Sequence, residues 1–152
     1  MPLPLDVAHT EKLASGFYAT VEVRVSPSLI TGKADLRNDS LFGYGAAWSI
    51  LLLDGNDAVI WTSDPQWKLV NAAVPNLKSL LTWRKGDAQT ASELIKIDFP
   101  SELSDNVQGA TIAIVRYEKG VEVTLRGFLE KARQEVAASK DVLRLLKEIF
   151  AS

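Results

Sequence analysis

The chain has 152 residues, of which 47% are hydrophobic and 24% are charged, and its formal net charge is −2. These proportions are typical of one globular domain and argue against a disordered chain. Basic residues do not outnumber acidic ones (17 against 19), which argues against a nucleic-acid partner. Because the chain has no cysteine, disulfides, thiolate catalysis and cysteine-ligated metals are excluded.

The N-terminal residues bear on localisation. Residues 1–6 have neither the basic start nor the apolar core of a signal peptide. The longest apolar runs, such as residues 50–53, are too short to span a bilayer. We therefore expect a cytoplasmic protein without a membrane span. A signal peptide already removed from a longer precursor is the alternative.

The first third of the chain predicts an arm and two strands. Residues 1–15 contain prolines and mix polar with apolar residues, which predicts a loosely attached N-terminal arm. Residues 17–25 alternate cleanly, so we expect a strand with one buried and one wet face. A more polar strand is expected over 32–37, followed by a turn at 38–40.

The middle of the chain predicts a hairpin. Residues 46–53 and 58–62 are apolar runs separated by an Asp/Gly/Asn cluster. The first run is apolar at both parities, which predicts a central strand covered on both faces. Asp64-Pro65 then predicts a turn, because the residue before proline is pushed out of the helical region. Residues 66–92 are left open between a short strand, a helical turn and loop.

The last third predicts strands and then a helix. A strand is expected over 94–99, and a second hairpin over 111–117 and 121–126. From residue 127 to 151, apolar residues recur at helical spacing, which predicts an amphipathic C-terminal helix. The chain is therefore expected to be one domain, residues 1–152, with a β-rich body over 16–126. The predicted fold is a mainly β antiparallel sandwich, or an open barrel, of about seven or eight strands.

One passage resembles a known family. Residues 93–99, a short spacer and residues 107–115 are similar to a strand–loop–strand passage of TerD-type stress-response sandwiches. That resemblance implies an acidic, glycine-rich calcium loop just upstream. The corresponding residues, 86–92, lack most of the acidic side chains. We therefore assign neither the family nor a calcium site.

Aromatic residues are the candidates for a binding site. Tryptophan and tyrosine are enriched at binding surfaces, where one end of the ring stays wet. Trp48 and Trp61 fall within predicted strands, so we expect them in the core. The remaining aromatic candidates for contacts with a ligand or partner lie at predicted strand ends or in loops: Phe42, Tyr44, Trp67 and Trp83.

The predicted C-terminal helix has a broad apolar stripe that must be buried somewhere. It could cover its own sheet or pair with a second subunit. The candidates for an oligomer contact are the last apolar residues: Leu145, Leu146, Ile149 and Phe150.

Catalysis has little support in the sequence. His9 is the one histidine and lies in the predicted arm, so we assign no catalytic residue, metal or cofactor. Aspartates in the first half are typical turn residues. We therefore expect a non-enzymatic binding or interaction module that self-associates through the C-terminal helix or a sheet face. The alternatives are a module that binds a small ligand or carbohydrate through exposed aromatics and, less favoured, a carboxylate-dependent hydrolase.

Overall fold

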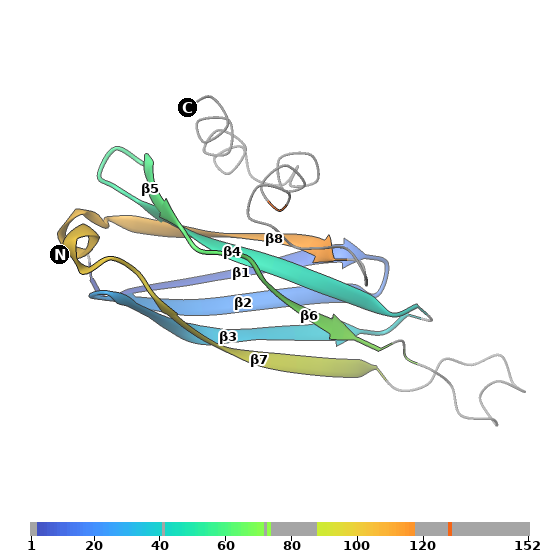
Figure 1. The fold of residues 1–152 in the computed structure, drawn as a ribbon. Helices are drawn as coiled ribbons and strands as arrows, with labels where there is room; N and C mark the ends of the chain where they lie inside the picture. The colour runs from blue at the N-terminus through green and yellow to red at the C-terminus, as the bar shows by residue number, and fades with distance from the viewer. Residues whose placement is uncertain (1–2, 41, 72, 74–87, 118–127, 129–152) are drawn as a thin grey trace, which may run out of the picture.

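The computed structural model describes residues 3–40, 42–71, 73, 88–117 and 128 (Figure 1). In this part of the chain eight strands and one short 3-10 helix follow one another. They are β1 (Leu5–Ala14), β2 (Phe17–Ser26), β3 (Leu29–Asn38), β4 (Tyr44–Leu53), β5 (Val59–Thr62), β6 (Gln66–Val70), β7 (Gln89–Asp98), η1 (Ser101–Asn106) and β8 (Gly109–Tyr117).

The strands form two antiparallel sheets that pack face to face (Figure 1). The first sheet has the order β1-β2-β3-β7. In the second sheet β4 is central, with β8 along one edge and both β5 and β6 along the other. Contacts between β1 and β8, and between β6 and β7, join the sheets at their two sides. The prediction of a mainly β antiparallel fold is confirmed.

The core lies between the sheets and is built by strand alternation. Every second residue of β2 from Phe17 to Val25 is buried, and the residues between them face outward. Trp48 is fully buried, and its indole N–H donates to Oε1 of Gln66 at 3.3 Å. Trp61 packs against Phe99, with ring centroids 5.8 Å apart. Both tryptophans therefore belong to the core, as the sequence predicts.

β4 is buried on both faces, as predicted for a central strand. Trp48, Ile50 and Leu52 face the core between the sheets. Ala47 and Leu51 lie on the opposite, outer face of the second sheet and are buried as well. Because both parities are shielded, the run reads as continuously apolar rather than alternating.

Ser63 lies between β5 and β6, the two strands that pair with the same edge of β4. Ser63 donates its backbone N–H to the carbonyl of Ile50, and its Oγ accepts the Ile50 N–H at 2.9 Å. The hydroxyl of Ser49 donates to the Ser63 carbonyl. These bonds satisfy buried backbone groups where the regular ladder is interrupted. Two short strands can therefore share one edge of β4.

The prediction of a loosely attached arm over residues 1–15 is wrong for most of that segment. Leu5–Ala14 forms β1 and pairs with β2 from Leu5↔Val25 to Ala14↔Phe17. The alternation is hidden in the sequence because His9 and Glu11 occupy half-buried inward positions, where an apolar residue is expected. The two side chains bond each other at 2.7 Å, which satisfies both polar groups at this side of the sandwich.

Two further predictions change in detail. β6 resolves part of the segment left open, since Gln66–Val70 is a strand paired with β4. β7 begins at Gln89, so residues 89–92 are strand rather than loop. Ser92 faces Asp35 across the sheet and donates to its carboxylate at 2.6 Å. Ser92 therefore lies on the solvent-facing side of an edge strand, whereas Ala91 next to it packs against the core.

Several predictions lie outside the described residues. The second strand of the predicted 111–126 hairpin, Trp83 and the predicted helix over 127–151 all fall there, except for Phe128, which is buried. No helix in the described part of the chain is long and apolar enough to cross a membrane.

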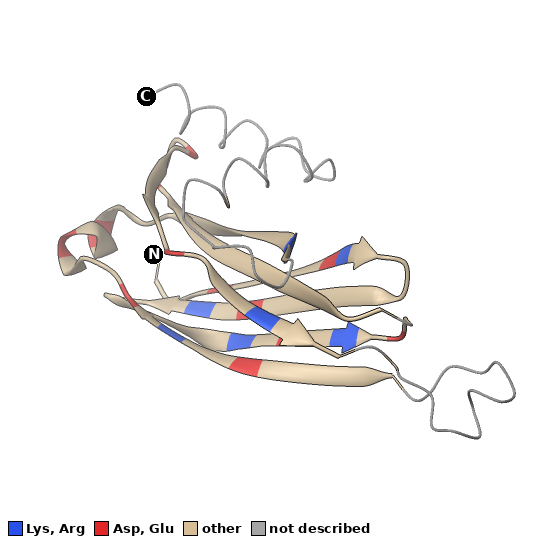
Figure 2. Ribbon diagram, turned by 45° about the vertical axis from the view of Figure 1, so that its right-hand side comes forward, with Lys and Arg blue, Asp and Glu red and all other residues tan. Residues whose placement is uncertain are grey.

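The outer face of the first sheet carries ion pairs, and Figure 2 marks the charged residues along its strands. Arg24 of β2 holds Asp6 of β1 through two hydrogen bonds of 2.9 and 3.1 Å. The hydrogen bond and charge of Arg24 lower the pKa of Asp6, and Asp6 raises the pKa of Arg24. The pKa of Asp35 is also lowered, first by the hydrogen bond from Ser92 and then by Lys33. These exposed pairs fix a solvated face and add little stability.

Candidate functional site

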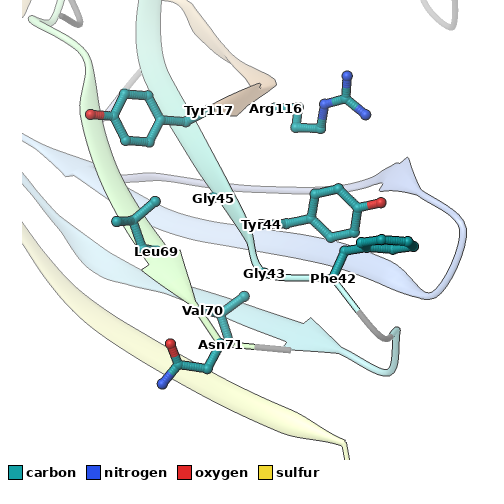
Figure 3. A pocket seen from close by; sticks show the side chains of 9 residues that line it. All are labelled: Phe42, Gly43, Tyr44, Gly45, Leu69, Val70, Asn71, Arg116 and Tyr117. Carbon is teal, nitrogen blue, oxygen red and sulfur yellow. The ribbon is translucent and has the colours of Figure 1, made fainter. Parts of the chain in front are cut away.

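A cavity of about 560 Å³ opens at one end of the second sheet, where β4 begins and β6 and β8 end (Figure 3). We call it the aromatic pocket. Its described lining residues are Phe42, Gly43, Tyr44, Gly45, Leu69, Val70, Asn71, Arg116 and Tyr117. Its volume and its mixture of apolar and polar groups are typical of small-molecule sites.

Two aromatic rings form one side of the aromatic pocket. Phe42 is 68% exposed and meets Tyr44 edge-on, with ring centroids 6.5 Å apart. Tyr44 in turn stacks on Phe17 of β2, with centroids 5.3 Å apart and the planes inclined by 16°. Phe17 is fully buried, so Tyr44 is anchored to the core while Phe42 reaches solvent. An exposed ring on an anchored one offers an apolar contact surface that is already in place.

On the other side of the aromatic pocket, Gly45 lets two neighbouring side chains lie close against β4. In the register of the second sheet, Gly45 lies between Leu69 of β6 and Tyr117 of β8. A Cβ atom at position 45 would be 2.6 Å from Cδ2 of Leu69 and 3.0 Å from Cδ1 of Tyr117. Only glycine therefore allows both side chains to approach the strand this closely.

Asn38 fixes the rim of the aromatic pocket. This side chain is fully buried at the end of β3. Its amide donates to the carbonyl of Phe42 at 2.6 Å and to the carbonyl of Asn71 at 3.1 Å. Its Oδ1 accepts hydrogen bonds from the backbone N–H and the hydroxyl of Ser40. The backbone carbonyl of Ser40 in turn accepts a hydrogen bond from the N–H of Ala73. One satisfied side chain thus joins the segment that carries Phe42 to the end of β6.

Trp67 extends the aromatic surface beyond the pocket. It stacks on Tyr117 with ring centroids 4.9 Å apart and remains 48% exposed. Both rings lie on the outer face of the second sheet, diagonally across β4. Three of the four predicted aromatic contacts, Phe42, Tyr44 and Trp67, therefore gather at this end of the sheet. Trp83 lies outside the described residues, as do the predicted oligomer contacts Leu145, Leu146, Ile149 and Phe150.

Sequence reasoning missed Asn71, Arg116 and Tyr117. Arg116 and Tyr117 reach the aromatic pocket through strand register, since Gly45 pairs with Tyr117 and Ala46 with Arg116. Asn71 directly follows β6. The guanidinium of Arg116 lies 5.9 Å from the centre of the Tyr44 ring, a cation–π arrangement. The one available signal was that Arg116 and Tyr117 lie at the end of a predicted strand, where binding residues gather.

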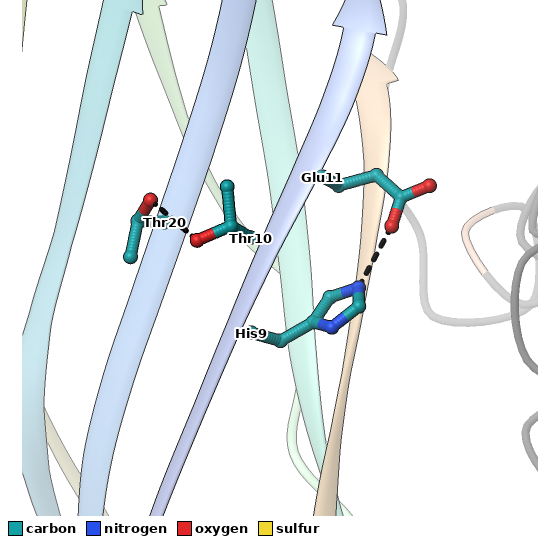
Figure 4. Close-up of polar contacts among 4 residues, drawn as sticks. All are labelled: His9, Thr10, Glu11 and Thr20. Carbon is teal, nitrogen blue, oxygen red and sulfur yellow. Dashed lines mark hydrogen bonds and ion pairs between the residues drawn. The ribbon is translucent and has the colours of Figure 1, made fainter.

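The histidine lies away from the aromatic pocket. His9 and Glu11 bond each other on one face of β1, while Thr10 bonds Thr20 at 2.9 Å on the other (Figure 4). In the described part of the chain, none of these residues lines the aromatic pocket. The bond between His9 and Glu11 explains how two polar side chains are tolerated at half-buried positions of β1.

The acidic turn between β4 and β5 follows ordinary turn chemistry. Oδ1 of Asp54 accepts the backbone N–H groups of Asn56 and Ala58 at 2.8 and 3.0 Å. Over the described residues, no group of three or more His, Cys, Asp or Glu side chains is placed to hold a metal ion.

Comparisons with protein-family models, with curated proteins and with solved structures return no match. The geometry of the site is therefore the basis for a functional proposal.

Proposed function

We propose that this protein is a non-enzymatic binding module that holds a small ligand in the aromatic pocket. The observation that carries the proposal is the exposed Phe42 ring, held in place by Tyr44 and by the Asn38 hydrogen bonds. Phe42 is 68% exposed and touches Tyr44 edge-on, so most of its ring is open to a ligand at the aromatic pocket. The hydrogen bonds that fix its backbone reduce the entropy lost when a ligand is ordered against it.

The chemistry of the lining favours a ligand with an apolar ring. Phe42, Tyr44 and Tyr117 supply aromatic surface, and Leu69 and Val70 supply aliphatic surface. Aromatic rings contact flat apolar groups and the apolar faces of sugars with little loss of side-chain entropy. A small aromatic molecule or a glycan therefore fits the site, and the ring-bearing ligand is the candidate developed below.

The test uses three probes with one phenylbutyl body: 4-phenylbutyrate, 4-phenylbutan-1-ol and 4-phenylbutylamine. Binding is followed by ligand-observed NMR on the full chain. We expect at least one probe to bind and Phe42→Ala to weaken it, because this change removes ligand contact and leaves the core intact. Leu94→Ala is the matched control, since Leu94 is 86% exposed on the first sheet. If no probe binds, or if both variants behave alike, the proposal fails.

Self-association is a second candidate, favoured by the outer face of the second sheet. Trp67 and Leu69 are 48% and 36% exposed side by side on β6, next to the buried Ala47 of β4. Exposed apolar residues in one patch favour a protein contact. Light scattering at rising concentration tests this candidate, with Trp67→Ser expected to lower the apparent mass. A truncation at Ala138 tests the predicted C-terminal helix, whose part in the proposal rests on sequence alone.

A further inference from the structure

β7 is an edge strand of the first sheet, and in the described part of the chain β3 is the one strand paired with it. It is ten residues long, and its register with β3 has no bulge. A long, regular edge pairs readily with another strand, which is why many edges are shortened, bulged or broken by proline. We infer that β7 pairs antiparallel with β7 of a second copy of this chain. None of residues 90–98 is among the described lining residues of the aromatic pocket, so this inference goes beyond ligand binding.

The open edge of β7 is formed by its even-numbered residues. Phe99 donates its backbone N–H to the carbonyl of Ser28 at 3.1 Å, so its backbone groups face β3. Backbone groups of successive strand residues point to opposite edges, so the other odd-numbered residues of β7 also face β3. The even-numbered residues therefore turn their N–H and C=O groups to the open edge: Thr90, Ser92, Leu94, Lys96 and Asp98.

Leu94 lies at the centre of this edge. Its side chain is 86% exposed on the outer face of the sheet, opposite Lys33 of β3. A twofold axis at Leu94 pairs residues 90–98 of one copy with residues 98–90 of the other, which satisfies every even-numbered residue. The two Leu94 side chains then lie directly opposite each other, where apolar cross-strand pairs stabilise a sheet. The position of the exposed leucine therefore fits a symmetric pair.

The charge of Lys96 fits the same register. With the axis at Leu94, Lys96 of one copy lies opposite Ser92 of the other. Ser92 is paired with Asp35 of β3 and bonds its carboxylate at 2.6 Å. Lys33 is also at that carboxylate, at 3.3 Å, and a carboxylate has room for more than two donors. The incoming ammonium group is therefore in the row of strand positions that holds a negative charge.

The charge of Asp98 fits this register as well. Asp98 of one copy lies opposite Thr90 of the other. Thr90 is paired with Arg37 of β3, whose side chain is exposed. The incoming carboxylate is therefore in a row that holds a positive charge. Both charged side chains on the outer face of β7 meet opposite charges when the two copies pair about Leu94.

Other registers bring like charges together. Sliding the second copy by two residues in one direction moves Lys96 into the row of Arg37. Sliding it by two residues in the other direction moves Asp98 into the row of Asp35. Sliding it by one residue places outward side chains opposite inward ones. The charges of β3 and β7 therefore favour the register centred on Leu94.

Amide hydrogen exchange tests this pairing residue by residue. Sedimentation velocity on the full chain over rising concentration gives the dimer dissociation constant, and exchange is then measured by NMR below and above it. When nine in ten chains are paired, we expect the amides of the even-numbered residues 90–98 to exchange roughly tenfold more slowly. The amides of the odd-numbered residues already face β3 and should change far less.

A charge reversal tests the register. Lys96→Glu is expected to weaken the dimer at least tenfold, because it places a carboxylate in the row of Asp35. Adding Asp35→Lys restores opposite charges and should recover most of that loss. Lys12→Glu is the matched control, since Lys12 is an exposed lysine of β1 at the opposite edge of the same sheet. It is expected to leave the dissociation constant unchanged.

A chain that stays monomeric at about 1 mM overturns the inference. A dimer without alternating protection over residues 90–98, or one that Lys96→Glu leaves unchanged, overturns it too. A dimer that Trp67→Ser abolishes while the amides of β7 stay unprotected assigns the contact to the second sheet instead. Probe binding in the aromatic pocket is measured separately, so the proposed function stands or fails independently of these outcomes.

Discussion

Replacing Asn38 with alanine is expected to destabilise the fold and to loosen the aromatic pocket together. The side chain is fully buried and makes four hydrogen bonds, to the carbonyls of Phe42 and Asn71 and from the N–H and hydroxyl of Ser40. Each such bond contributes about 0.5–1.5 kcal/mol net, and a buried group left without a partner costs more. The single hydroxyl proton of Ser40 can turn from Asn38 to the Phe42 carbonyl in the variant, so part of the network survives.

We therefore expect Asn38→Ala to lower the free energy of unfolding by about 2–4 kcal/mol. Urea unfolding followed by tryptophan fluorescence measures the change, as a midpoint lowered by roughly 1–2 M at constant slope. Probe binding to the folded variant should also weaken, because the segment that carries Phe42 is no longer fixed to the end of β6.

The matched control is Asn56→Ala, since Asn56 is an exposed residue of the turn between β4 and β5. It is expected to change the unfolding free energy by less than about 0.5 kcal/mol. Equal effects of the two substitutions would refute the reasoning, because the buried Asn38 side chain with its four hydrogen bonds would then contribute no more to stability than an exposed side chain.

Three further outcomes follow from the described contacts. Gly45→Ala should lower the unfolding free energy by about 1–3 kcal/mol and weaken probe binding, because the new methyl group overlaps the side chains of Leu69 and Tyr117. Unchanged binding would contradict this account. Ser63→Ala should lower the unfolding free energy by about 1–3 kcal/mol and speed hydrogen exchange at the Ile50 amide, whose buried N–H loses its acceptor. Unchanged exchange at that amide would disprove the assigned bond. Ser92→Ala should raise the pKa of Asp35 toward its ordinary value, because the hydroxyl bond to the carboxylate is lost. The stability linked to Asp35 is present above its unfolded pKa and is lost as pH falls through its lowered folded pKa. In the variant this contribution should therefore be smaller, and its loss should be complete at a higher pH. Carboxyl NMR titration checks the shift, and an unmoved pKa would show that the bond has no effect.

Strands with undisturbed alternation were predictable from the sequence. β2 and the inward residues of β7 follow period two because one face meets the core and the other meets water. β4 was also predictable, since an apolar run that ignores parity fits only a strand covered on both faces. In these elements local pattern and tertiary burial agree.

β1 and β6 were not predictable for different reasons. β1 has polar His9 and Glu11 at inward positions, and their mutual bond, which makes this tolerable, becomes visible only in three dimensions. β6 is a short strand directly after Pro65, where the sequence signals a turn. Its identity comes from pairing with β4, which local pattern does not encode.

Two of the nine described lining residues of the aromatic pocket were named from the sequence. Phe42 and Tyr44 were found because they are aromatic residues at a predicted strand end, where binding residues gather. Arg116 and Tyr117 come into the aromatic pocket through the register of β8 on β4, between residues about 70 positions apart in the chain. Asn38 was predicted to be in a turn, and its role depends on partners at Phe42 and Asn71.

The most direct test of the central claim is chemical-shift mapping of 4-phenylbutyrate on the ¹⁵N-labelled full chain. The account predicts that the largest shifts fall on the backbone amides of residues 42–45 and 69–71 and on Arg116 and Tyr117, and that Phe42→Ala reduces them. Shifts that are absent, or that concentrate on the outer face of the first sheet, would contradict the claim that the aromatic pocket is a ligand site.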